Sequence, residues 1–214
     1  MFADTYAYLL AAQWPAIDAE TGFDRHVMAC VLSLARFEVE EGASPSISAA
    51  TGLTLSELSR LINRNFPGLD RRLFDFVACE APVIDDEEAM LQQLLLRHAA
   101  NGLELAPLFA RIVARRAMHD DHLWQDLGLF SRPELSRMLY RNFPTLAAGN
   151  TSNMKWKKYF YRALCEAEGF VLCTAPSCRQ CDDFEDCFGT EDGESRLARI
   201  RNAAPAEGLF HAGA

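Results

Sequence analysis

The stretch Glu57-Leu58-Ser59-Arg60-Leu61-Ile62-Asn63-Arg64-Asn65-Phe66-Pro67 returns 77 residues later as Glu134-Leu135-Ser136-Arg137-Met138-Leu139-Tyr140-Arg141-Asn142-Phe143-Pro144, with eight of the eleven positions identical. In both copies the apolar side chains recur at helical spacing, and the two arginines lie four residues apart on one face. Each copy ends at a proline, which disfavours a helical conformation at the residue before it. The repeat therefore predicts a duplicated helical hairpin, with two units in one domain.

Short polar segments lead into both copies of the repeat. They follow Gly52 and Gly128, and Ser56 and Ser131 are the candidate N-caps. Helical periodicity predicts four more helices, over residues 24–41, 85–98, 105–118 and 152–168. Asp85 and Glu88 form a capping-box pattern at the start of the second of these.

The third of these helices, 105–118, is amphipathic, and we expect Arg111, Arg115 and Arg116 on its polar side. The alternation of apolar and polar residues that marks strands is absent, so the sequence predicts a mainly α fold. The expected organisation is a helical scaffold domain over residues 1–168, an irregular cysteine-rich segment over 169–190 packed on it, and a weakly ordered tail over 191–214. A marginal helix is expected near 194–202.

The composition of the 214 residues excludes several classes of protein. Half of the chain is hydrophobic, which separates it from disordered sequences, and it has no apolar run of the ~18 residues that a membrane span needs. The first residues lack the basic and apolar pattern of a secretory signal. A net charge of −9 argues against nucleic acid or an anionic membrane as a partner. We expect a soluble, cytoplasmic protein.

The seven cysteines divide into two groups. Cys30, Cys79 and Cys165 have apolar neighbours and are expected to be buried. The other four form the array C-x4-C-x2-C-x5-C, made of Cys173, Cys178, Cys181 and Cys187. Since consecutive members are separated by at most five intervening residues, their sulfurs can converge on one small inorganic centre.

Four thiolates at this spacing are candidate metal ligands. They suit zinc or an iron–sulfur cluster, and a redox dithiol is a third reading. Common four-cysteine zinc sites use two C-x2-C pairs across a longer loop, whereas this array is compact and closer to the runs that hold iron–sulfur clusters. Acidic residues surround it, and they either favour an oxidised, less negative cluster or form a solvated loop: Asp182, Asp183, Glu185 and Asp186.

Two further groups are candidate cofactor-binding residues. Lys155, Lys157 and Lys158 concentrate positive charge, which would lie near an anionic cluster if the cysteine segment folds back on them; otherwise they form a solvated basic face. His119 and His122 are three residues apart, a spacing that fits one helix face, and they either bind a metal or cap a helix end.

Three blocks of this sequence resemble the NifQ family. The cysteine array, continuing into Phe188-Gly189, is similar to the terminal signature of that family. So is Met154-Lys155-Trp156-Lys157-Lys158-Tyr159-Phe160-Tyr161-Arg162 with the following Leu164-Cys165-Glu166, and His122-Leu123-Trp124-Gln125-Asp126-Leu127-Gly128-Leu129 is similar to a third block. The resemblance covers roughly residues 24–189.

This resemblance implies molybdenum handling in nitrogen fixation. Proteins of the family carry an iron–sulfur centre that incorporates molybdenum, with molybdate as the source, and supply the metal for assembly of the nitrogenase iron–molybdenum cofactor. The implied partners are the cofactor scaffold complex and the nitrogenase iron protein. Such a carrier need not catalyse turnover of an organic substrate, and the sequence carries no Gly-rich phosphate loop, G-x-S-x-G elbow or H-E-x-x-H pair. We therefore do not expect an enzyme.

An alternative from another class is a DNA-binding regulator that senses metal or redox state. The segments 48–60 and 128–137 read like helix-turn-helix units. Each candidate recognition helix carries only two arginines, however, whereas strong binding usually needs around 6–10 phosphate contacts. A structural zinc protein is the other alternative.

Overall fold

The computed structural model describes residues 2–12, 18–70, 74, 81–167, 184–191 and 193. Over these residues the fold is mainly α, as expected, and they include no β-strand. The helices are α1 (Phe2–Ala11), α2 (Ala19–Glu40), α3 (Ile47–Thr51), α4 (Leu55–Asn65), α5 (Asp86–Arg97), α6 (Ala106–Ala117), α7 (Leu123–Asp126), α8 (Arg132–Asn142), α9 (Pro144–Gly149), α10 (Trp156–Ala167) and α11 (Phe184–Phe188). None of the described helices is long and apolar enough to cross a membrane.

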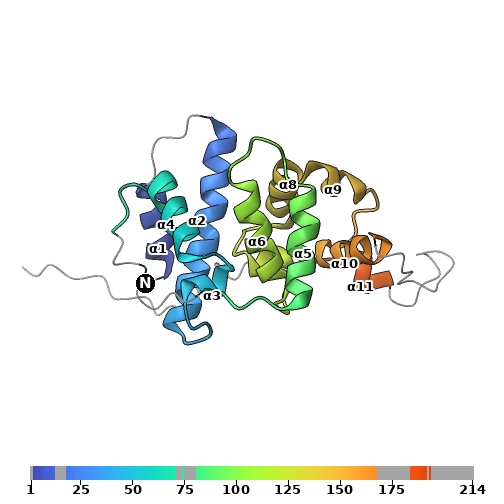
Figure 1. The fold of residues 1–214 in the computed structure, drawn as a ribbon, viewed down its shortest axis with the longest axis horizontal. Helices are drawn as coiled ribbons and strands as arrows, with labels where there is room; N and C mark the ends of the chain where they lie inside the picture. Colours follow the sequence, from blue (N-terminus) through green and yellow to red (C-terminus); the bar gives the residue numbers. More distant parts are fainter. Residues whose placement is uncertain are drawn as a thin grey trace, which may run out of the picture.

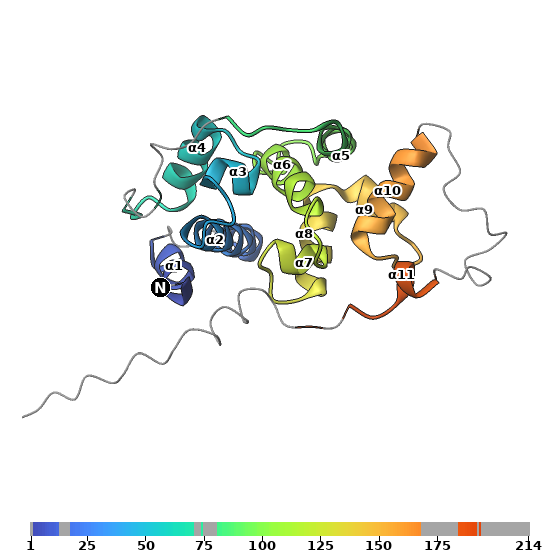
Figure 2. The same ribbon diagram turned by 90° about the horizontal axis from the view of Figure 1, so that it is seen from below.

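The helices follow the long axis of the molecule in approximate chain order. Figures 1 and 2 both show α1–α4 at one end, α5–α8 in the middle, and α10 and α11 at the other end. Helix α2 packs against α1 and α3, α6 packs against α5, and α10 also packs against α5. The segment that carries Cys187 therefore lies far from the N-terminal helices.

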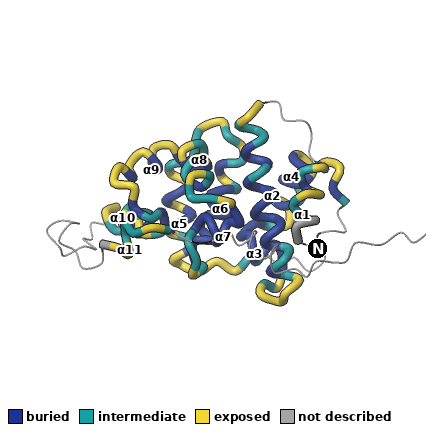
Figure 3. The backbone as a smooth tube through the Cα atoms, turned by 180° about the vertical axis from the view of Figure 1, so that it is seen from behind, coloured by how far each residue is buried: buried dark blue, intermediate teal, exposed yellow. Residues whose placement is uncertain are grey.

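Helix α2 is the centre of the N-terminal half. Val27, Met28, Cys30 and Val31 have no exposed surface, and Figure 3 shows most of this helix buried. It begins five residues before the predicted start because the Asp18 side chain caps it, accepting a 2.7 Å hydrogen bond from the backbone N–H of Thr21.

The two copies of the repeated motif form α4 and α8. The N-cap of α8 is Ser131 as predicted, but the N-cap of α4 is Thr54 and not Ser56. Thr54 is the N-cap because it completes a capping box with Glu57, whose carboxylate accepts a 2.9 Å hydrogen bond from the Thr54 N–H.

The same local hydrogen bonds end both copies. Asn65 donates its side-chain N–H to the Leu61 carbonyl at 2.9 Å, and Asn142 donates in the same way to Met138 at 3.0 Å. Pro144 does not only follow α8: it also opens α9, because proline is favoured in the first turn of a helix. The duplication of a complete hairpin stays a prediction.

Helix α6 contradicts one expectation. Arg116 does not lie on a polar side: it is fully buried and donates hydrogen bonds of 2.6 and 2.8 Å to the two carboxylate oxygens of Glu38 in α2. Arg115 lies 3.1 Å from Glu88 in α5, and Arg111 lies 3.1 Å from Glu57 in α4. The three arginines thus connect α6 to three other helices, which hydrophobic periodicity alone does not reveal.

Candidate metal centre

Cys187 lies in α11 and is partly exposed. Cys173, Cys178 and Cys181 lie outside the described residues, as does the expected helix near 194–202, so convergence of the four sulfurs stays a prediction. Of the cysteines expected to be buried, Cys30 is buried, Cys165 is only partly so, and Cys79 lies outside the described residues.

Helix α11 docks on Lys155, the residue directly before α10. The backbone N–H of Lys155 donates a 2.8 Å hydrogen bond to the carbonyl of Cys187, and the Lys155 ammonium donates a 2.9 Å hydrogen bond to the carbonyl of Glu185. The Cys187 carbonyl thus satisfies an N–H next to the start of α10, where a helix leaves such donors without partners of its own. Residues 184–188 do fold back onto the basic helix (Figure 2).

The three lysines of the basic segment have different surroundings. Lys155 binds the Cys187 segment, as above. Lys157 turns towards α7, where its ammonium lies 2.7 Å from the fully buried carboxylate of Asp126 and also donates to the carbonyl of His119. Lys158 is exposed. Only Lys155 is therefore placed beside Cys187 by a hydrogen bond.

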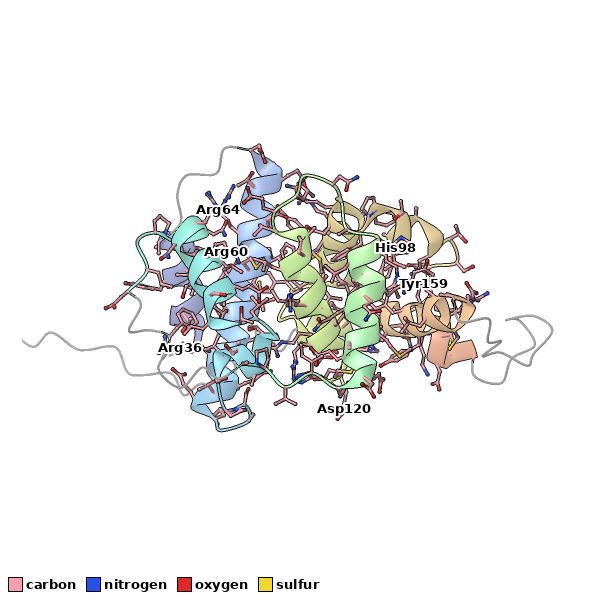
Figure 4. All side chains as sticks on the ribbon, viewed as in Figure 1. Arg36, Arg60, Arg64, His98, Asp120 and Tyr159 are labelled. Carbon is pink, nitrogen blue, oxygen red and sulfur yellow. The ribbon has the colours of Figure 1, made fainter. Side chains whose placement is uncertain are left out.

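His119 and His122 do not share a helix face. Helix α6 ends at Ala117 and α7 begins at Leu123, so both histidines lie in the connecting turn, where Figure 4 also labels Asp120. His119 lines a cavity of about 720 Å³ together with Glu38 and Arg115, whereas His122 lies with its Nδ1 3.9 Å from Oε1 of Glu191. A shared helix face is excluded because α6 ends at Ala117, whereas the helix-end alternative holds for His122, which is the N-cap of α7.

In the part of the chain that the structure describes, no group of three or more His, Cys, Asp or Glu side chains is arranged to hold a metal ion. The other three cysteines of the array, Cys173, Cys178 and Cys181, lie beyond these residues.

Sequence reasoning missed three residues around the Cys187 segment. Glu191 was assigned to a weakly ordered tail, yet its side chain is only 7% exposed and its Oε2 lies 3.0 Å from Nε of Arg132 in α8. Neither residue belongs to a motif, and a single arginine or glutamate carries no sequence signal for a contact across 59 positions.

Asn153 is the third such residue. It has a φ of +55° in the turn that precedes α10, and its side-chain oxygen accepts a 2.8 Å hydrogen bond from Arg132. This turn delays the start of α10 to Trp156, four residues after the predicted start. Asparagine tolerates the left-handed region better than most residues, which is the one local signal for it.

Known proteins match most of this chain. The NifQ family model matches residues 27–189. A "Protein NifQ homolog" of Sinorhizobium fredii is 54% identical over 182 residues, covering 85% of this chain and 79% of the relative. "Protein NifQ" of Rhodobacter capsulatus is 40% identical over 178 residues, covering 83% and 93%. "Protein NifQ" of Azotobacter vinelandii is 54% identical over 108 residues, covering 50% and 54%.

No solved structure matches this chain. The family model covers three quarters of the sequence, and its span includes all four cysteines of the array as well as the basic segment before α10. The chain therefore belongs to the NifQ family.

Proposed function

We propose that this protein carries an iron–sulfur cluster on Cys173, Cys178, Cys181 and Cys187, binds molybdenum in or beside that cluster, and donates it for assembly of the nitrogenase iron–molybdenum cofactor. The observation that carries the proposal is the span of the family match, which ends two residues after Cys187 and so contains the complete array. The family resemblance supplies the link to nitrogen fixation.

The chemistry of the donor set suits this cargo. Four thiolates are the common ligands of iron–sulfur clusters, and Cys187 is partly exposed and held by its backbone, so its sulfur need not be buried in the helical core. High-valent molybdenum is a harder ion than Fe(II) and tolerates oxygen or nitrogen ligands beside sulfide, which admits His122 and the acidic residues near the array as additional ligands.

The charges around α10 support an electrostatic role for two lysines. Lys155 lies against the Cys187 segment and Lys158 is exposed, so both can attract molybdate or lower the cost of gathering thiolates. We do not assign this role to Lys157, because its ammonium is used by Asp126 and the His119 carbonyl. His119 faces the separate cavity and is a weaker candidate than His122.

The protein acts in this account as a carrier and not as a catalyst. Its partners would be the cofactor scaffold complex and the nitrogenase iron protein. Release of the cargo requires at least one ligand that exchanges, whereas retention requires others that stay fixed. The anchored Cys187 is our candidate for a fixed ligand.

The DNA-binding alternative loses support from the contacts of the arginines in α4 and α8. Arg64 pairs with Glu104, Arg137 lies 2.6 Å from Glu20, and Arg141 lies 2.9 Å from Asp24. Figure 4 places Arg60 and Arg64 on α4, where Arg60 is exposed. A phosphate backbone would have to compete with carboxylates for three of the four arginines of the two motifs.

The proposal is tested by replacing Cys173, Cys181 or Cys187 with alanine, with Cys165→Ala as the matched control outside the array. After anaerobic iron and sulfide reconstitution, we expect each array variant to lose bound iron and visible absorption while its far-ultraviolet circular dichroism stays that of the wild type. Iron binding that survives all three changes contradicts the proposal, and loss of helical signal on metal loss points to structural zinc. Tight, specific binding to duplex DNA at physiological salt would support the regulator instead.

A further inference from the structure

We infer that Arg132 is a positioning residue for the metal centre. It contacts the turn that binds the Cys187 carbonyl, and it also contacts Glu191, which follows Cys187 in the chain. Together these contacts fix the place of Cys187. That Cys187 is a metal ligand rests on the proposed function. The geometry stands on contacts among described residues alone.

The first part of the contact set joins Arg132 to the turn before α10. One terminal nitrogen of the guanidinium donates a 2.8 Å hydrogen bond to the side-chain oxygen of Asn153, and the other donates to the carbonyls of Asn153 and Met154 at 3.1 and 3.0 Å. Asn150 closes the same turn, since it accepts from the Met154 N–H at 2.8 Å and donates to the Met154 carbonyl at 2.9 Å. The planar guanidinium can make these contacts together because its donors form a fixed fork.

The second part leads from this turn to Cys187. Lys155 directly follows Met154, and its backbone N–H is the donor to the Cys187 carbonyl. The Met154 carbonyl and the Lys155 N–H belong to one planar peptide unit, so Arg132 fixes the same peptide that donates to the cysteine carbonyl. This path from Arg132 to Cys187 runs through backbone groups and uses no Cys, His, Asp or Glu side chain.

The third part approaches Cys187 from its other side. Glu191, four residues after Cys187, places its carboxylate 3.0 Å from Nε of Arg132, with the glutamate side chain 7% exposed and the arginine side chain 22% exposed. An ion pair this well shielded is weakened little by salt, unlike a pair on the surface. The contacts form a closed ring that runs through Arg132, Met154, Lys155, Cys187 and Glu191.

A ring of this kind serves a centre that must both hold and release a metal. Ligands keep their geometry only when surrounding contacts orient them. Arg132 carries no ligand atom itself, and it acts on the centre only through the turn before α10 and the side chain of Glu191.

The test compares Arg132→Gln with Arg137→Gln, which lies in the same helix but pairs with Glu20 and not with the Cys187 segment. In metal-free protein, peptide mass mapping gives the alkylation rate of Cys187, with the fully buried Cys30 as an internal reference for global unfolding. We expect Arg132→Gln to raise the Cys187 rate roughly tenfold, equivalent to about 1.4 kcal/mol of local stability, with the Cys30 rate unchanged. Arg137→Gln should leave both rates unchanged.

The second readout is the reconstituted cluster. In Arg132→Gln its paramagnetic resonance signal should broaden and its iron should be lost to a chelator faster than in Arg137→Gln. If Arg132→Gln does not fold, Glu191→Gln replaces it, because the amide keeps the shape of the side chain and removes its charge. An unchanged Cys187 rate, or equal acceleration at Cys187 and Cys30, overturns the inference. If the wild type binds no iron, the proposed function fails, while the alkylation rates still decide the role of Arg132.

Discussion

The Lys157 ammonium lies 2.7 Å from the carboxylate of Asp126, which has no exposed surface. This pair joins α10 to α7, and the same ammonium also donates to the His119 carbonyl just after α6. A lysine that sequence reasoning groups with cofactor-binding residues therefore has a structural task. In the basic segment before the cysteine array, Lys157 thus stabilises the fold, whereas Lys155 contacts the Cys187 segment.

Replacing Lys157 with methionine should destabilise the protein strongly. The change leaves the Asp126 carboxylate buried without its cation, and breaking a buried pair from one side costs about 3 kcal/mol or more. Urea unfolding followed by circular dichroism measures the loss. Lys158→Met is the matched control on the exposed neighbour and should stay within about 0.5 kcal/mol of the wild type. Equal stabilities for the two variants would refute the structural assignment.

Removing the charge of Glu38 should be still more costly. Glu38→Gln leaves the fully buried guanidinium of Arg116 without its carboxylate, for an expected loss of about 3–5 kcal/mol. Glu104→Gln, which breaks the exposed pair with Arg64, should cost under about 1 kcal/mol. The double variant Glu38→Leu with Arg116→Met should recover most of the loss, because both buried charges are then removed. A double variant no more stable than Glu38→Gln would contradict this account.

Two glycines with the same backbone angle should respond differently to alanine. Gly42 and Gly52 both have a φ of +72°, so each alanine pays about 1–2 kcal/mol for the left-handed conformation. A Cβ at Gly52 would also lie 3.1 Å from the Cβ of Arg115 and 3.3 Å from the Arg111 carbonyl oxygen, whereas nothing lies within 4 Å at Gly42. Gly52→Ala should therefore lower the free energy of unfolding by about 1 kcal/mol more than Gly42→Ala, and an equal loss would mean that α3 and α6 separate at little cost.

Glu134 should contribute a pH-dependent part of the stability. Burial works to raise the pKa of this carboxyl, but hydrogen bonds from His26 and from the Phe130 N–H outweigh it, and the pKa lies below the usual 4.5. The stabilisation is therefore present above pH 4.5 and is lost as the pH falls through the lowered folded-state pKa. The gap in melting temperature between the wild type and Glu134→Gln should shrink on acidification from about pH 6 to about pH 3. A gap in melting temperature that widens in acid would contradict a lowered pKa for Glu134.

Helices α2, α4, α5 and α8 were predictable because their sequences contain both an apolar stripe and a capping side chain, whereas α6 has no side-chain cap and only its stripe marks it. Asp85 accepts the Glu88 N–H at 2.8 Å at the start of α5, as the pattern indicates, although the Glu88 carboxylate itself turns to Arg115. Helices α7, α9 and α11 have only four to six residues, too few to show periodicity, and they form where longer helices hold them. Helix α1 was missed because its alanines and aromatic residues leave no distinct polar face.

The cysteine array was visible in the sequence, but the way in which Cys187 is held was not. The donor to Cys187 is a backbone N–H, and every residue except proline has one, so no sequence pattern can mark Lys155 for this task. The sequence gives no signal for the pairing of Arg132 with Glu191 either, because charge composition does not specify which residues pair. Such contacts are set by the path of the chain around α10.

The central claim is that the four-cysteine array holds an iron–sulfur centre that accommodates molybdenum. Its most direct test is metal analysis of the full chain, purified without oxygen and reconstituted with iron, sulfide and molybdate, together with paramagnetic resonance. The account predicts bound iron and molybdenum and a cluster signal that disappears in Cys187→Ala. One zinc per chain, with neither iron nor molybdenum bound after reconstitution, would contradict it.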